Sequence, residues 1–142
     1  MGSGRNYNPE GGFKTYNWQF YGETIDGVKI IYNKPGTEGP DGLPYHSGAS
    51  KAYFKKVKGE IVQLRLYKNR RAFLDIDINP LKPHNHKGKN YMPAGITHVH
   101  EWIPKKEGGF RRNKYARFLS DQEIKDFGDL LEKANSNVRY RP

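Results

Sequence analysis

The sequence predicts an α+β domain with a small, mainly antiparallel sheet, and three segments carry this prediction. Apolar and polar residues alternate on both sides of a short turn over residues 60–79, which predicts a β-hairpin. The same alternation predicts a further strand over 96–103. A capping-box pattern from Ser120 to Glu123 precedes apolar residues at helical spacing, so we expect an amphipathic helix over 120–134, packed on the sheet.

The remaining segments have weaker patterns. Residues 28–32 are expected to form a short strand, and residues 49–58 either a short helix or an irregular basic segment. Segments rich in glycine and proline, or without a clear period, are expected to be loops or irregular structure: 5–24, 33–50, 80–95 and 104–118.

Length and composition exclude several classes of protein. The 142 residues fit one domain, and no apolar run approaches the roughly 18 residues of a membrane span. The absence of cysteine excludes disulfides, thiolate zinc sites and cysteine nucleophiles. Residues 1–4 are interpreted as a cloning remnant and no secretory signal is visible, so 5–142 is expected to be a single domain taken from a longer protein.

Positive charge is concentrated in two segments. The chain carries a net charge of +10; residues 51–71 contain eight basic residues against Glu60, and residues 104–118 contain six against Glu107. Basic side chains release counterions from a phosphate backbone, so a nucleic acid is the expected partner, although the charge could also belong to a solubilising surface. The candidate substrate-binding residues are Arg65, Lys55, Lys56, Arg70, Arg71, Arg111, Arg112 and the aromatic Trp102.

Histidine and aspartate are clustered between these basic segments. Four of the five histidines fall within 17 residues, as His84, His86, His98 and His100. Residues two apart on a strand share a face, so His98 and His100 are expected on one face of their strand. The same rule places two carboxylates together on the hairpin, Asp75 and Asp77. If the two strands pair, these four side chains meet.

Two chemistries fit this cluster. Histidines acting as general acid and base, with carboxylates orienting them, would cleave RNA without a metal. Alternatively, His98, His100, Asp75 and Asp77 would hold zinc, manganese or magnesium, which activates water. The first chemistry requires no cofactor. His46 is a separate catalytic candidate, and a solvated or structural role is the alternative for the whole cluster.

The order of these residues resembles a known toxin family. The pattern Arg65-Leu-Tyr, Asp75-Ile-Asp77, His84-x-His86 and His98-Val-His100-Glu-Trp102 is similar to C-terminal toxin domains of bacterial polymorphic toxins, of the Rhs, contact-dependent inhibition and LXG systems. The match covers about residues 60–103. The resemblance implies a small effector domain, delivered as part of a larger secreted protein into a target-cell cytoplasm, and neutralised by an immunity protein.

The leading hypothesis is therefore a monomeric nuclease toxin, more a ribonuclease than a deoxyribonuclease, with tRNA among its candidate substrates. Its immunity protein is expected to be acidic, because the domain is basic, and no membrane association is expected. The alternatives are a metal-dependent deoxyribonuclease or hydrolase using the same cluster, a non-catalytic nucleic-acid-binding module, and an NAD-consuming transferase.

Overall fold

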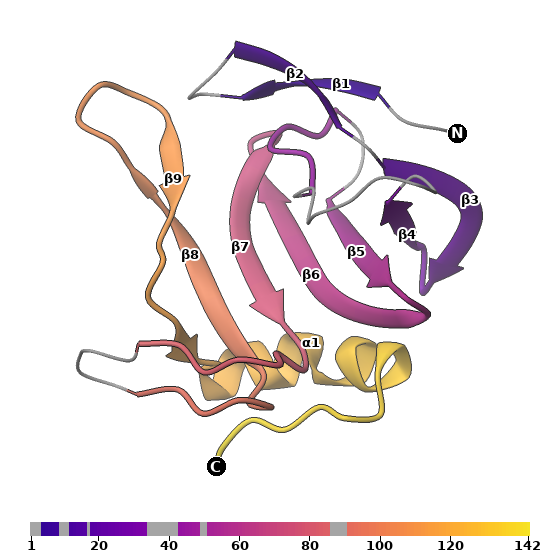
Figure 1. The fold of residues 1–142 in the computed structure, drawn as a ribbon, viewed down its shortest axis with the longest axis vertical. Coiled ribbons are helices and arrows are strands. Elements are labelled where there is room, and N and C mark those ends of the chain that lie inside the picture. The colour runs from indigo at the N-terminus through magenta and orange to yellow at the C-terminus, as the bar shows by residue number, and fades with distance from the viewer. Residues whose placement is uncertain (1–3, 9–11, 17, 34–42, 49–50, 86–90) are drawn as a thin grey trace.

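The computed structural model has an α+β architecture, as predicted, and describes residues 4–8, 12–16, 18–33, 43–48, 51–85 and 91–142. Strands β1 and β2 form a two-stranded hairpin, and the other eight strands form one sheet, which is larger than predicted (Figure 1). The elements are β1 (Gly4–Asn8), β2 (Gly12–Tyr16), β3 (Trp18–Ile25), β4 (Val28–Asn33), β5 (Ala52–Val57), β6 (Glu60–Lys68), β7 (Arg71–Asp77), β8 (His98–Pro104), β9 (Phe110–Arg112), β10 (Arg117–Phe118) and α1 (Asp121–Ala134).

The large sheet is mixed but mostly antiparallel. Its order is β10-β8-β7-β6-β5-β4-β3, and β9 also pairs with β8. Among the strand pairs of the described residues, β4 and β5 are the one parallel pair. The predicted hairpin 60–79 is confirmed as β6 and β7, and the predicted strand 96–103 as β8. These three strands are adjacent in the middle of the sheet.

Three two-residue turns connect neighbouring antiparallel strands of this sheet. They join β3 to β4, β5 to β6 and β6 to β7, and both central residues of each turn have positive φ values between 50° and 81°. Two-residue turns of this kind match the twist of the strands that they connect. The central dipeptides are Asp26-Gly27, Lys58-Gly59 and Asn69-Arg70.

Several segments predicted as irregular are strands. The prediction of a short helix or an irregular segment over residues 49–58 is wrong, since the described residues of this segment form β5. The strand is favoured because it places Phe54 in a fully buried position between Ile30 of β4 and Leu64 of β6. The segment 5–24, which lacked a clear period, contains β1, β2 and most of β3. The basic segment 104–118 contains β9 and β10, which both pair with β8.

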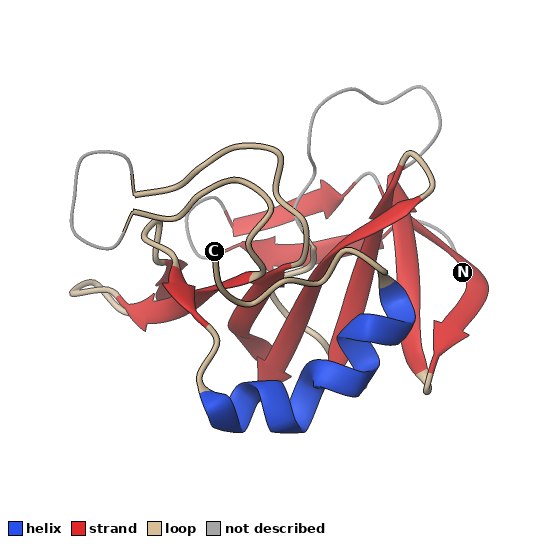
Figure 2. Cartoon of the chain, turned by 90° about the horizontal axis from the view of Figure 1, so that it is seen from below, coloured by secondary structure: helices blue, strands red, loops and turns tan. Residues whose placement is uncertain are grey.

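The core follows one row of residues across the sheet. Each residue of this row is paired in register with the next and has no solvent exposure: Ile30, Phe54, Leu64, Ile76 and Val99. Leu131 of α1 belongs to the same buried cluster, and other apolar residues of the helix pack against it. Figure 2 shows α1 lying along this side of the sheet.

Helix α1 is fixed at both ends. The predicted capping box is present, since Ser120 Oγ accepts from the Glu123 N–H and the Glu123 carboxylate accepts from the Ser120 N–H. At the other end, the Asn135 side chain donates to Glu60 and to the Ile61 carbonyl, which ties the helix terminus to β6. Within the described residues, no helix is long and apolar enough to cross a membrane.

The position of Leu131 predicts a large effect on stability. Leu131→Ala should lower the free energy of unfolding by about 2–5 kcal/mol, because it removes a fully buried side chain from the core. Leu81→Ala is the matched control, since Leu81 is 90% exposed and should change the stability by less than about 0.5 kcal/mol. Urea unfolding followed by circular dichroism measures both, and equal effects would contradict the described core.

Candidate functional site

Two rows of polar residues lie on the face of the sheet opposite the buried row. Strand residues alternate between faces, so the neighbours of the apolar row point the other way. Asp77 faces His98 and Asp75 faces His100 in the β7–β8 register, as the sequence predicts if these strands pair. The rows continue through β6 and β5 as Lys55, Gln63, Asp77 and His98, and as Tyr53, Arg65, Asp75 and His100.

Four side chains from this face and the preceding loop converge on one point. Asp77, His84, His98 and His100 each place one nitrogen or oxygen atom within 4.8 Å of all the others. The Nε2 atoms of His98 and His100 are 3.1 Å apart. The Oδ2 atom of Asp77 lies 3.1 Å from Nε2 of His98 and 3.4 Å from Nε2 of His100. We call these four residues the histidine cluster.

Backbone carbonyls orient two of the imidazole rings. Nδ1 of His98 lies 3.0 Å from the Ile96 oxygen, and Nδ1 of His100 lies 2.8 Å from the Asn113 oxygen. A carbonyl only accepts hydrogen bonds, so each Nδ1 carries the hydrogen, and Nε2 of the neutral ring carries a lone pair. Both rings are fully buried. When both rings are neutral, the Nε2 lone pairs face each other and the Asp77 carboxylate. When a ring is protonated, its Nε2–H donates to Asp77 instead.

His84 completes the cluster from the loop between β7 and β8. Its ring centre lies 4.6 Å from that of His98 and 5.2 Å from that of His100. A two-way backbone bridge between His84 and Met92 holds this part of the loop. Burial, together with the neighbouring histidines, lowers the pKa of His84, which favours the neutral ring. His86 lies outside the described residues.

Asp77 is the negative centre of the cluster. Burial alone would raise its pKa, but hydrogen bonds with His100 and His98 and the charge of Arg112 outweigh this and hold the pKa well below its usual range. Asp77 is therefore an anion at neutral pH. Its side chain is 17% exposed, so the histidine cluster reaches solvent on this side.

Asp75 lies beside the histidine cluster and is held by two arginines. Its carboxylate is fully buried and makes two hydrogen bonds with Arg65, of 2.6 and 2.9 Å, and a third with Arg112, of 2.7 Å. Two arginines occupy both of its oxygen atoms, and Asp75 is not one of the four residues whose ligand atoms converge. The fourth residue of that group is His84. Asp75 anchors the two arginines beside the histidine cluster.

Arg112 connects this ion pair with the histidine cluster. Besides Asp75, its guanidinium contacts the Asp77 carboxylate at 3.1 Å, and its side chain is 33% exposed. Arg65 packs with its guanidinium carbon 4.9 Å from the ring centre of Trp102, which also contacts Tyr45. Trp102 is thus a packing partner of Arg65 in this structure, and its Nε1 has no hydrogen-bond partner among the described residues.

His46 does not join the histidine cluster. It lies in the segment 43–48, where its Nδ1 is 3.2 Å from the Arg70 carbonyl oxygen and its ring packs on Tyr45. His46 therefore lies outside the histidine cluster, and its catalytic role stays a prediction.

The other predicted substrate-binding residues are spread over the molecule. Lys55 follows Gln63 in the polar row and is buried, and Lys56 forms an ion pair with Glu23 at 3.6 Å. Arg71 packs on Phe110 of β9, and Arg111 is exposed on the same strand. Arg70 lies at the β6–β7 turn. Two members of the predicted set, Arg65 and Arg112, form ion pairs with the carboxylates beside or within the histidine cluster.

The groups that the sequence did not reveal are backbone atoms. The carbonyls of Ile96 and Asn113 determine the orientation of His98 and His100, and any residue type can supply a carbonyl. A comparison of the chain with protein-family models, with curated proteins and with solved structures found no match. The functional assignment therefore depends on the geometry of these residues.

The buried ion pair predicts a large effect of Arg65 on stability. Arg65→Ala should lower the free energy of unfolding by about 3–5 kcal/mol, because it removes a buried cation from a buried carboxylate. Arg117→Ala is the control, since its ion pairs with Glu101 and Glu123 are partly exposed and worth about 1 kcal/mol or less. Comparable losses in urea unfolding would refute the structural role of the Arg65–Asp75 pair.

Proposed function

We propose that the histidine cluster binds a divalent cation and that the chain is a metal-dependent nuclease. The observation that carries the proposal is the convergence of one ligand atom from each of three imidazoles and one carboxylate within 4.8 Å, where the facing Nε2 atoms of neutral His98 and His100 are acceptors. Acceptor atoms this close repel one another unless a cation lies between them. The separations of 3.1, 3.1 and 3.4 Å support this, because ligands at zinc–nitrogen distances of about 2.0–2.1 Å in a tetrahedron lie about 3.3 Å apart.

The donor set favours zinc over magnesium. Magnesium prefers oxygen ligands and usually retains several waters, whereas imidazole nitrogen suits zinc and other transition metals. The hydrogen bonds from Nδ1 of His98 and His100 to carbonyl oxygens are the outer contacts that fix metal-binding histidines. Manganese, with its affinity for carboxylates, is the next candidate.

The bound ion would supply a Lewis acid and a water of lowered pKa. The chain's own residues supply the rest of the site. Arg112 is one-third exposed at the edge of the histidine cluster and already contacts carboxylates, which supports a role of its guanidinium in binding a phosphate beside Asp77. Arg65 and Asp75 keep Arg112 in position. The net charge of +10 supports nucleic acid as the polyanionic substrate, with RNA favoured.

Metal-independent cleavage of RNA is the second candidate. The hydrogen bonds between Asp77 and the two histidines favour it, because a carboxylate in this position stabilises an imidazolium. It takes second place because an acid and a base must lie on opposite sides of the reacting phosphorus, and the Nε2 atoms of His98 and His100 are in contact at 3.1 Å.

The biological setting remains a proposal that rests on the resemblance to polymorphic toxin domains. We propose that the nuclease acts as a toxin delivered within a larger protein, and that an acidic immunity protein blocks it. The excess of basic residues supports an acidic partner, since opposite potentials accelerate and strengthen association.

Zinc should stabilise the folded chain. At a zinc concentration about 100-fold above the dissociation constant, the free energy of unfolding should rise by about 2.7 kcal/mol, because the folded state alone holds the four ligands together. His98→Ala should abolish most of this gain, whereas His46→Ala should keep it, because His46 lies outside the histidine cluster. Unfolding with and without zinc, and metal analysis of the purified chain, measure the effect. Stabilisation that persists in His98→Ala would exclude this site.

Nuclease activity should depend on the same ion. Cleavage of single-stranded RNA should stop in EDTA and return with zinc or manganese, and His100→Ala should reduce the rate at least about 10- to 100-fold. His46→Ala is again the control and should retain activity. RNA cleavage that continues in EDTA would favour the second candidate, and no cleavage of RNA or DNA in any metal would reject the nuclease proposal.

A further inference from the structure

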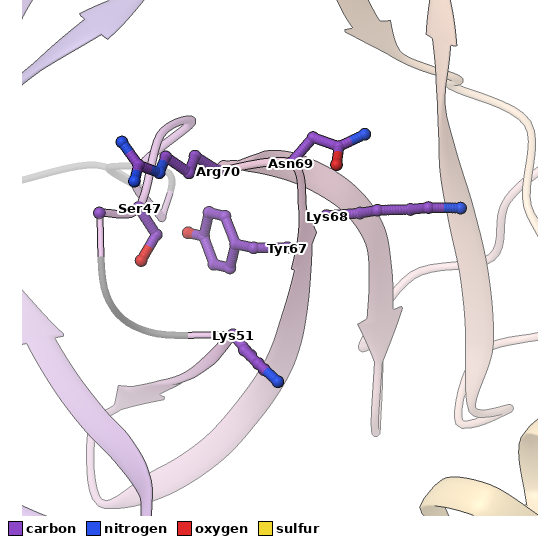
Figure 3. A pocket seen from close by; sticks show the side chains of 7 residues that line it. Ser47, Lys51, Tyr67, Lys68, Asn69 and Arg70 are labelled. Atoms are coloured by element: carbon purple, nitrogen blue, oxygen red, sulfur yellow. The ribbon is translucent and has the colours of Figure 1, made fainter.

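A pocket of about 470 Å³ lies at the β6–β7 turn, apart from the histidine cluster. Figure 3 shows the Tyr67 ring in this pocket, with Arg70 and Lys51 at its two ends and Ser47 across from the ring. The lining residues are Ser47, Gly48, Lys51, Tyr67, Lys68, Asn69 and Arg70.

The lining is cationic and contains no acidic side chain. None of the ion pairs between described residues involves Lys51, Lys68 or Arg70. Lys68 points away from Tyr67 and lies over the Phe73 ring at 5.2 Å, so Lys51 and Arg70 carry the charge of the pocket (Figure 3). Two cations without a described carboxylate partner favour an anionic ligand.

The walls of the pocket are tied together by hydrogen bonds. The segment 43–48 is held to β6 and β7 because the Tyr67 hydroxyl donates to the Pro44 carbonyl and the Ser47 N–H donates to the Arg70 carbonyl at 3.0 Å. The Tyr67 N–H donates to the Lys51 carbonyl at 2.9 Å. The pocket is therefore formed before a ligand binds, which lowers the entropic cost of binding.

The pocket and the histidine cluster share one face of the sheet. Tyr67 follows Arg65 by two residues on β6, so both side chains point to the same face, with their Cα atoms about 7 Å apart. Arg65 pairs with Asp75, and Asp75 faces His100. Between the pocket and the histidine cluster, Arg65 is buried and donates to carbonyls of the segment 43–48. A strand of nucleic acid that runs past this segment would meet the pocket at one end and the histidine cluster at the other.

We propose that this pocket binds a phosphate group of the substrate strand, at a nucleotide other than the one that is cleaved. The inference rests on the proposed nuclease function for the identity of the strand. Lys51 and Arg70 would contact the phosphate oxygens, and Ser47 would add a hydroxyl. Phosphate contacts of this kind set the position of a strand and carry no base preference.

The test measures the binding of a labelled 2′-O-methyl RNA of about 12 nucleotides, a length within single-strand site sizes, as a function of salt. The variants are Lys51→Gln and Arg70→Asn, since asparagine suits the positive φ of 62° at residue 70. Lys125→Gln on α1 is the control for the loss of one charge. A gel verifies that the probe stays intact, and circular dichroism verifies that each variant folds.

Each pocket variant should bind about 3- to 10-fold more weakly, and the slope of log K against log salt should fall by about 0.7 per lost contact. Lys125→Gln should leave the slope unchanged. The probe is used with and without a 5′-phosphate: equal losses identify an internal phosphate, and a loss only with the 5′-phosphate identifies a terminal one. Slopes equal to that of Lys125→Gln in both pocket variants would overturn the proposal.

The result separates this inference from the nuclease proposal. Binding to the pocket requires no turnover, so the slopes test it even if the chain cleaves nothing. Conversely, if the pocket does not bind phosphate, the results expected from the zinc and cleavage experiments stay the same. If the chain cleaves RNA, Lys51→Gln and Arg70→Asn should raise KM more than they lower kcat, because the contact is made equally in the ground and transition states.

Discussion

The antiparallel register of β7 and β8 is the constraint on which the site depends. It places Asp77 opposite His98 and Asp75 opposite His100, and the row of buried residues on the other face fixes it. A slip of one residue would turn the carboxylates and imidazoles into the core and the apolar row into solvent. Pairing of β7 and β8 in this register therefore brings three of the four cluster residues together, Asp77, His98 and His100.

Within this register, the two carboxylates have separate tasks. Asp75 is buried and neutralised by Arg65 and Arg112, whereas Asp77 keeps some exposure and faces the imidazoles. The shared partner Arg112 links the structural ion pair with the candidate metal centre. Breaking the ion pair would therefore displace Arg112, whose guanidinium we expect to bind the substrate phosphate.

Strand periodicity predicted the part of the site that lies on regular structure. Alternation identified β6, β7 and β8 and placed His98 and His100 on one face, and the capping box located α1. The Asp26-Gly27 dipeptide, a typical type I′ sequence, could have revealed the hairpin of β3 and β4. Alternation alone could not separate Asp75 from Asp77, because it places both on one face. Their difference arises from the cross-strand partners on β6, which are Arg65 for Asp75 and Gln63 for Asp77. Nor could alternation place His84, which depends on the path of a loop.

Two short strands that follow β8 in the chain, β9 and β10, both pair with β8. β9 pairs with the end of β8 and β10 pairs with its start. Between them the Asn113 N–H still donates to the Glu101 carbonyl, and the chain leaves the ladder after Asn113 until β10 begins. This departure frees the Asn113 carbonyl to receive the His100 ring hydrogen. Such a short, edge-located return is the kind of unit that opens by itself in native-state amide hydrogen exchange. Each opening of this edge would break the hydrogen bond of His100 while the buried row stays folded. The fraction of molecules with His100 correctly oriented is therefore set by this local opening and not by the global free energy of unfolding.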